Sequence, residues 1–159
     1  FDFLGDVMLL DWQKETTPVL YGGNAVKVLD MRIVNAGETA FSMHWHERME
    51  LLLVTEGETA VSFGDEEFSA SAGNLVIIPP GQPHCGVAVR VPLKYYAIMF
   101  DISPFGGDIP SVAVFMEQLK NKSIGFERLT DRPEIIASAD ESVCFVPSVL
   151  RAQISDSER

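Results

Sequence analysis

Short runs of apolar residues alternate with turn residues through the middle of the chain, and this pattern predicts β-structure. Glycine, asparagine, aspartate or proline separates most of the runs, which is typical of the tight turns in sandwiches and barrels. We expect about eight strands, with no internal repeat of fixed period. The clearest predicted strands are residues 26–34, 49–55, 59–63, 66–71, 75–78, 86–91 and 93–100.

After Phe100 the pattern changes from strand to helix. Pro110 and Ser111 are typical of a helix start, and the apolar residues that follow recur at positions i, i+3, i+4 and i+7. These residues are Val112, Phe115, Met116 and Leu119. The stripe needs a partner surface, either the outside of the barrel or the same helix of a second subunit, and the pattern does not distinguish the two. Shorter helices are expected at residues 133–139 and 147–154.

The expected fold class is therefore all-β with a short α-helical C-terminal extension. Residues 1–102 are expected to form a β-barrel, and residues 103–159 a helical extension that packs on the barrel or on a dimer partner. Residues 1–23 precede the first clear strand and mix aromatic with acidic side chains. They form either an arm across the mouth of the barrel or an edge strand, and we predict the edge strand.

Composition and charge narrow the class of protein. Of the 159 residues, 47% are hydrophobic and 22% are charged, which fits one soluble domain. The formal net charge of -11 repels polyanions, so we expect no direct nucleic-acid binding by this chain. No apolar run reaches the roughly 20 residues that span a bilayer. No secretory leader is visible at Phe1, and Cys85 and Cys144 lie far apart, so a cytoplasmic protein with reduced cysteines is expected.

All three histidines of the chain stand in two short motifs that carry candidate metal ligands. His44 and His46 are followed by Glu50, and the proline-rich turn 79–83 leads directly to His84. On one strand His44 and His46 would face the same side, because successive side chains alternate. Imidazole nitrogen and carboxylate oxygen suit a borderline divalent ion. We therefore predict a metal site with these four ligands, whose ion is Zn, Ni, Fe, Mn or Cu.

The spacing of these residues resembles the two motifs of the cupin superfamily, whose fold is a double-stranded β-helix, a small jelly-roll barrel. The first motif is matched, with one extra residue after its first glycine, by Gly37, His44, His46, Glu50 and Gly57. The second is matched, with Ala88 where an asparagine is usual, by Gly73, Pro79, Gly81 and His84. The resemblance covers residues 37–88 and implies that the three histidines and Glu50 are metal ligands.

Within this superfamily the chain is most similar to the N-terminal ligand-sensing and dimerisation domain of AraC-type transcription regulators. Residues 46–57, 73–84 and 96–103 carry this resemblance. It implies that the barrel binds a small effector, a sugar or another metabolite, that an arm can close on it, and that C-terminal helices pair two subunits. The regulators bind DNA through a separate helix-turn-helix module. This chain is expected to lack that module.

Two other functions stay open from the sequence. Four protein ligands leave positions free on an octahedral ion, so the alternative is a stand-alone metal-dependent enzyme, such as a dioxygenase, an isomerase or a sugar-modifying cupin. Candidates for an acid or a base are Arg32, Arg90, Tyr95 and Tyr96, but no residue is assigned to catalysis. The third possibility is that the metal is structural or absent, and that the polar cluster binds the ligand directly.

Overall fold

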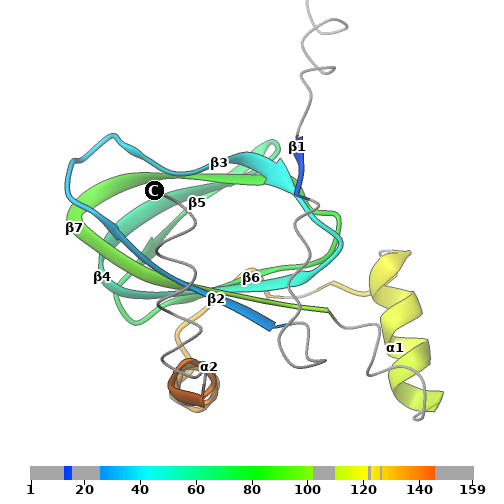
Figure 1. Cartoon of the computed structure of the whole chain (residues 1–159). Helices are drawn as coiled ribbons and strands as arrows, with labels where there is room; N and C mark the ends of the chain where they lie inside the picture. Colours follow the sequence, from blue (N-terminus) through cyan, green and yellow to red (C-terminus); the bar gives the residue numbers. More distant parts are fainter. Residues whose placement is uncertain (1–12, 16–25, 102–109, 122, 126, 146–159) are drawn as a thin grey trace, which may run out of the picture.

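The computed structural model describes residues 13–15, 26–101, 110–121, 123–125 and 127–145. In this part of the chain the strands curve into a barrel, and two helices lie outside its wall (Figure 1). The strands are β1 (Gln13–Lys14), β2 (Val26–Ile33), β3 (Thr39–Trp45), β4 (Met49–Phe63), β5 (Glu66–Ser71), β6 (Leu75–Ile78), β7 (His84–Phe100) and β8 (Leu129–Thr130). The helices are α1 (Pro110–Lys120) and α2 (Pro133–Phe145).

Two long strands, β4 and β7, organise the barrel. They pair with each other from Met49 opposite Phe100 to Ser62 opposite Cys85. The second half of β7 also pairs with β2 and its first half with β3, while β4 pairs with β5 and β6. All of these pairings are antiparallel. The result is a jelly-roll barrel of the double-stranded β-helix type, as predicted.

Strand alternation places apolar side chains on both faces of the barrel wall. In β4, Leu52 and Val54 belong to the cluster that fills the barrel, whereas Leu53 belongs to a second cluster outside it. The outer cluster includes Ala139 and Ile135 of α2. Because both faces are covered, this segment is a continuous apolar run and not an alternating one. Full burial of each such side chain contributes about 1.5–3 kcal/mol.

Helix α1 begins at Pro110, as predicted, and part of its apolar stripe packs on the barrel. Leu119 is buried in a cluster with Met49 of β4. Phe115 remains 44% exposed. The side chains of Val112 and Met116 lie outside the part of the chain that is described. The contact at Leu119 supports packing on the barrel for one end of the stripe and leaves the outer part of α1 without a described cover.

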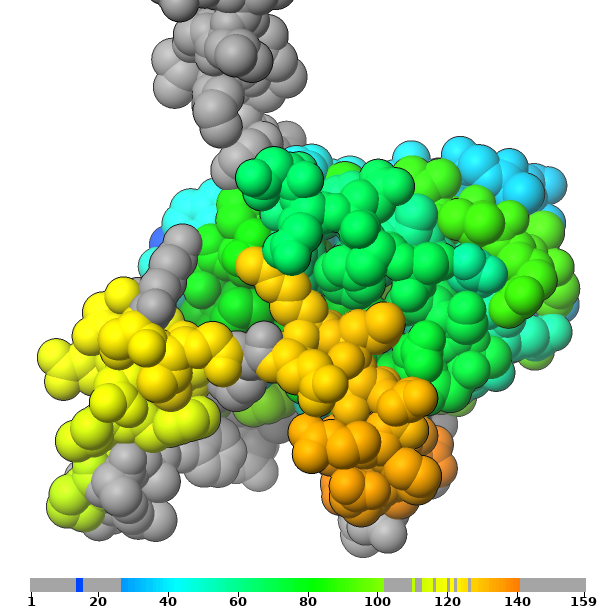
Figure 2. All heavy atoms as spheres, turned by 180° about the vertical axis from the view of Figure 1, so that it is seen from behind, coloured from blue at the N-terminus to red at the C-terminus, as the bar shows by residue number. Residues whose placement is uncertain are grey.

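Helix α2 is longer than expected, because it continues to Phe145 and not to residue 139. The space-filling view shows α1 and the segment leading to α2 as separate masses on the outer surface of the barrel (Figure 2). The helix predicted at residues 147–154 lies outside the described residues. No helix among the described residues is both long and apolar enough to cross a membrane.

The edge strand predicted near the N-terminus corresponds to β1. It pairs in parallel with β3, placing Gln13 next to His44 and Lys14 next to Trp45. The amide of Glu15 extends this contact by donating a hydrogen bond of 2.9 Å to the carbonyl oxygen of Trp45. β1 is the end strand of the sheet, and it brings polar side chains to the histidines.

Candidate metal centre and ligand cavity

The four predicted ligands lie at the ends of three different strands. His44 is near the end of β3, His46 follows that strand, Glu50 is the second residue of β4, and His84 is the first residue of β7. The pairing of β3 with β7 sets His44 directly opposite His84. The amide of Gly81 donates a hydrogen bond of 2.7 Å to the carbonyl oxygen of His46, which ties the proline-rich turn to the β3–β4 connection.

The structure brings these four residues, which we call the quartet, to one point. Each offers one nitrogen or oxygen atom, and these atoms all lie within 4.8 Å of one another. This is close to the span set by one ion with bonds of about 2.0–2.2 Å to each ligand. Among the described residues, this is the one group of at least three histidine, cysteine or acidic side chains close enough for a shared ion.

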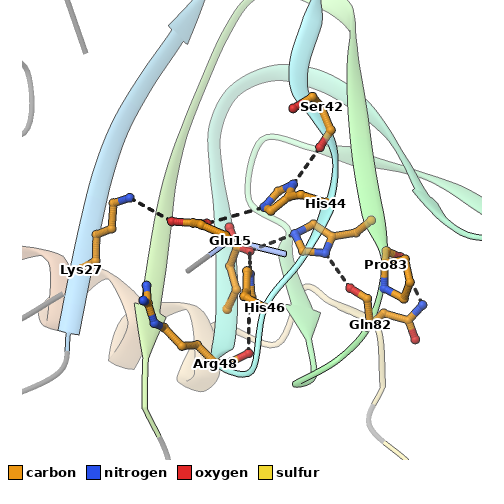
Figure 3. A network of polar contacts seen from close by, with 10 residues as sticks. Glu15, Lys27, Ser42, His44, His46, Arg48, Gln82 and Pro83 are labelled. Atoms are coloured by element: carbon orange, nitrogen blue, oxygen red, sulfur yellow. Dashed lines mark hydrogen bonds and ion pairs between the residues drawn. The ribbon is translucent and has the colours of Figure 1, made fainter. Parts of the chain in front are cut away.

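Main-chain carbonyl groups orient all three imidazole rings. The Nδ1 atoms of His44, His46 and His84 lie 2.7, 3.0 and 2.8 Å from the carbonyl oxygens of Ser42, Arg48 and Gln82, respectively (Figure 3). A carbonyl oxygen only accepts, so each Nδ1 carries the hydrogen and Nε2 is left for another partner. A ligand histidine is usually held in this way, with its other ring nitrogen donating to a carbonyl or carboxylate group.

The Nε2 atoms meet a carboxylate in the interior. Glu50 Oε2 lies 2.7 Å from Nε2 of His46 and 3.0 Å from Nε2 of His84. Both Nδ1 atoms already donate to carbonyl groups, so at these distances two unprotonated Nε2 atoms would direct their lone pairs at a carboxylate oxygen. A cation held between these atoms would remove that repulsion. The donor set fits a divalent metal.

Burial and hydrogen bonding set the charges of the quartet. Burial alone would raise the pKa of Glu50, but the hydrogen bonds and the charge of His46 and His84 lower the pKa of this carboxyl group to about 2. Burial lowers the pKa of His44 below 6.5, and this effect exceeds the raising effect of its hydrogen bond to Ser42. At neutral pH Glu50 is therefore ionised and His44 is neutral, the forms that bind a metal ion.

A cavity of about 480 Å³ opens beside the quartet. His44 and Glu50 lie in its wall, whereas His46 and His84 are fully buried behind them. The apolar part of the wall consists of Leu29, Met31, Ala40, Phe41, Leu52, Tyr95, Ala97 and Met99. Its polar part adds Lys14, Glu15, Lys27 and Ser42. The volume is typical of small-molecule sites, and the wall combines apolar side chains with several charged and polar ones.

Sequence analysis did not identify Glu15 and Lys27 as site residues. Figure 3 shows the Glu15 side chain between Lys27 of β2 and His44 of β3. Its Oε1 lies 3.3 Å from Lys27 Nζ, and its Oε2 lies 3.9 Å from His44 Nε2. The sequence does carry a signal for Lys27, because Lys27 alternates with Leu29 and Met31 along one strand and therefore faces the barrel interior with them. Glu15 has no comparable signal, since its place depends on the distant pairing of β1 with β3.

The four residues considered for an acid or a base have different positions. Tyr95 lines the cavity, and its hydroxyl donates a hydrogen bond of 2.8 Å to the carbonyl oxygen of Ala40. Arg32 and Arg90 are exposed, and Tyr96 packs against the outer cluster. Cys85 is half-buried beside the fully buried His84, as expected for neighbours that face opposite sides of a strand.

Comparisons with known proteins give similar solved structures and one family model. Curated proteins give no match. Among solved structures, an RmlC-like cupin family protein with a double-stranded β-helix fold from Methanocaldococcus jannaschii is 17% identical, with a TM-score of 0.44 over 47% of this chain and 69% of that one. KdgF from Halomonas sp. is 18% identical, with a TM-score of 0.44 over 47% of this chain and 67% of its own.

A further similar structure is that of the oxalate decarboxylase of Bacillus subtilis, determined in a study of its Mn(II) centres. It is 20% identical, with a TM-score of 0.44, and the match covers 69% of this chain and 34% of that enzyme. The chain thus spans about a third of the length of the decarboxylase. The family model of the AraC-like ligand binding domain matches residues 29–108, just over half of the chain, including the whole quartet. The chain therefore belongs to the family of AraC-like ligand binding domains.

Proposed function

We propose that this chain senses a small organic molecule that binds in the barrel cavity beside a divalent metal ion held by the quartet. One observation carries the proposal: His44 and Glu50 line a cavity of about 480 Å³. The volume lies within the roughly 300–1,000 Å³ of ordinary small-molecule sites. Membership in a family of ligand binding domains supports a binding role.

The residues of the quartet have different tasks in this proposal. His46 and His84 are buried and tied to the main chain, so they would anchor the ion. His44 and Glu50 would hold the ion on the side of the cavity. A bound divalent ion supplies a Lewis acid that attracts oxygen or nitrogen atoms of a ligand. The protein itself sets the tautomers, the charge of Glu50 and the shape of the space.

Sensing requires that the ligand bind one conformation better than another. The elements available to report this difference are β1, which brings Glu15 to the cavity, and α1, which packs on Met49 next to Glu50. In a regulator of this type, α1 would pair two subunits, and DNA would be bound by a module of the full-length protein other than this chain. The finer proposal is therefore a homodimer whose operator affinity depends on the effector.

The first test measures the metal. The protein is saturated in turn with Zn, Ni, Fe, Mn and Cu, dialysed, and analysed for bound metal per chain. We expect one ion per chain, and a loss of that ion when His46 and His84 are replaced by glutamine, which keeps polar groups in the site. A metal content that these substitutions leave unchanged would refute the quartet as the site.

The second test measures sensing. A set of sugars and other small metabolites is screened by the change in melting temperature of the metal-loaded protein, and the compounds that raise it are tested on the full-length regulator. The expected result is a change in operator affinity of about 5-fold to 150-fold, the range of ordinary allosteric coupling. Operator affinity that stays unchanged when such a compound is bound would refute sensing.

An enzyme is the second candidate, and one observation favours it: the cavity reaches the quartet itself, through His44 and Glu50. A substrate in the cavity could therefore contact the ion, with Glu15 in the same wall as a candidate acid or base toward the substrate. The same screened compounds discriminate the two candidates. Chemical conversion of a bound compound by the metal-loaded protein, followed by mass spectrometry, supports the enzyme, whereas recovery of the compound unchanged supports the sensor.

A further inference from the structure

The cavity contains a partly buried cationic group that the quartet does not explain. Two of the five lysines of the chain, Lys14 and Lys27, line it, although the net charge is -11. Lys27 lies on β2 opposite Met99 of β7, and its side chain is only 15% exposed. Lysine is among the residues least often buried. An ammonium group directed into a ligand cavity therefore needs an anionic partner.

Glu15 provides that partner, but at long range. Its two oxygens lie 3.3 Å from Lys27 Nζ and 3.9 Å from His44 Nε2. Charge-assisted hydrogen bonds of this kind are usually about 2.7–2.9 Å long. The neighbouring pair of Lys14 and Glu47, which faces solvent, reaches 2.7 Å. The carboxylate of Glu15 thus accepts one long hydrogen bond, from Lys27, and lies farther from His44.

The position of Glu15 depends on a short strand. β1 comprises Gln13 and Lys14 and pairs only with β3 among the described strands. Its contact continues through one hydrogen bond, from the amide of Glu15 to the carbonyl oxygen of Trp45. Among the described residues, the printed contacts of Glu15 are this hydrogen bond, its long hydrogen bond with Lys27 and its approach to His44, so a free carboxylate that approaches Lys27 more closely could replace it with the charge conserved.

The rest of the wall defines the body of such a ligand. The wall also carries the polar groups of Lys14, Ser42 and Glu50, and the remaining part is aliphatic, thioether and aromatic, including Leu29, Met31 and Phe41. An apolar group placed there removes its surface from water, which stabilises binding by about 25 cal/mol per Å².

We propose that the ligand of this cavity is a small organic carboxylate with an apolar body, and that its carboxylate replaces that of Glu15 at Lys27. The proposal rests on the proposed function, because it assumes that this cavity is the ligand site. It names the ligand class and assigns two residues, Lys27 as the anchor and Glu15 as an internal competitor. Release of Glu15 would also free β1 from the side of the cavity.

The test compares benzoate with benzamide, which has the same shape and no charge. Binding is measured by calorimetry with zinc-loaded and with metal-free protein. We expect benzoate to bind at least about 10-fold more tightly than benzamide, which corresponds to a difference in binding free energy of about 1.4 kcal/mol. The substitution Lys27→Met, which keeps the length of the side chain and removes its charge, should abolish this preference. The control Lys94→Met removes a lysine that does not line the cavity, and it should keep the preference.

The substitution Glu15→Gln gives the opposite result and does not depend on Lys27→Met folding. Because it removes the competing charge, benzoate should bind several-fold more tightly and raise the melting temperature more than in the native protein, while benzamide binding stays the same. Three results would overturn the proposal: no binding of benzoate, equal binding of the two compounds, or benzoate affinity that Glu15→Gln does not increase.

The same experiment separates this proposal from the proposed function. If the protein binds one metal ion and its full-length form responds to a neutral effector, while benzoate shows no preference, sensing stands and the carboxylate class is wrong. If benzoate binds through Lys27 in metal-free protein and no metal is retained on dialysis, the carboxylate site stands and the metal part of the function is wrong.

Discussion

His44 and His84 lie directly opposite each other on β3 and β7, with their ring centroids 4.3 Å apart and their planes inclined by 55°. They come from segments 40 positions apart in the chain, so this pair forms only when the barrel closes. His46 and Glu50, by contrast, are separated by one short connection. The quartet therefore joins a pair that is local in sequence, His46 and Glu50, to a pair that is distant in sequence, His44 and His84.

Replacing His44 with alanine should lower zinc affinity by at least about 100-fold. Loss of a residue that only supports a ligand lowers affinity by up to about 100-fold, and loss of a ligand itself should cost at least as much. The fold should survive, because the side chain of His44 is partly exposed at the cavity. Affinity is measured by competition with a chelator, and the fold by circular dichroism. Cys85→Ala is the control, since this thiol adjoins His84 yet is expected to face away. If Cys85→Ala weakens zinc binding as much, the ligand set is wrong.

Acid should destabilise the metal-free protein through Glu50 and His44. The pKa of Glu50 falls from 4.5 to about 2 on folding, so the stability that this carboxylate contributes is present above pH 4.5 and is lost as the pH falls toward 2. The pKa of His44 is also lowered, so protonation below pH 6.5 favours the unfolded chain. The free energy of unfolding, measured in urea, should therefore decrease as the pH falls from 6.5.

Glu50→Gln isolates the contribution of the carboxylate to this pH dependence. The variant should lose less stability than the native protein between pH 4.5 and 2, because its side chain does not titrate. The control is Glu117→Gln, which replaces an exposed glutamate of α1. An acid profile of Glu50→Gln that matches those of the native protein and of Glu117→Gln would contradict the assigned pKa.

Gly57→Ala should lower the free energy of unfolding by more than about 3 kcal/mol, beyond the usual effect of a single substitution. Gly57 has a φ of +77°, and a Cβ atom there would lie 2.3 Å from the carbonyl oxygen of Arg90 and 2.4 Å from that of Pro92. Gly64→Ala is the matched control, because its φ is +70° but no atom lies within 4 Å of the new Cβ. It should cost about 1 kcal/mol from backbone strain alone. If urea unfolding shows that Gly57→Ala and Gly64→Ala lose the same free energy of unfolding, the steric clash at Gly57 is disproved.

Gly86→Ala should weaken zinc and ligand binding, although Gly86 belongs to neither site. A Cβ atom at this position would lie 2.4 Å from the ring of Phe41. That ring lies 5.9 Å from the ring of His84 and 6.1 Å from that of Tyr95, and it lines the cavity. The substitution should therefore push Phe41 toward His84 or into the cavity. Adding Phe41→Leu should restore zinc affinity, and a double mutant that remains as weak as Gly86→Ala would refute this explanation.

The strand pattern was predictable where turns are local. Residues 66–71 and 75–78 were predicted with the bounds that β5 and β6 have. Breaks were predicted at Gly57 and Pro92, yet β4 and β7 run through both positions. The pairing of the two strands shifts register around Gly57. Glycine and proline here mark a bend in a continuous strand, which sequence alone does not separate from a turn.

The site was predictable in part for a similar reason. The quartet was predictable from motif spacing, although His84 joins the other three only through the pairing of β3 with β7. The position of Glu15 depends on the parallel pairing of β1 with β3, which involves only two residues of each strand. No periodicity of the chain reports such a contact. β8, another strand of two residues, was missed for the same reason.

Met49 and Glu50 are neighbours in β4, and their side chains face opposite sides of the barrel wall. Met49 lies under Leu119 of α1, while Glu50 contacts the buried histidines. Adjacent residues of β4 thus contact the outer helix on one face of the wall and belong to the quartet on the other. Labels, tags or surface redesign placed beneath α1 will consequently alter the interior, and the outward face of β4 at this point is unsuitable as a neutral attachment site.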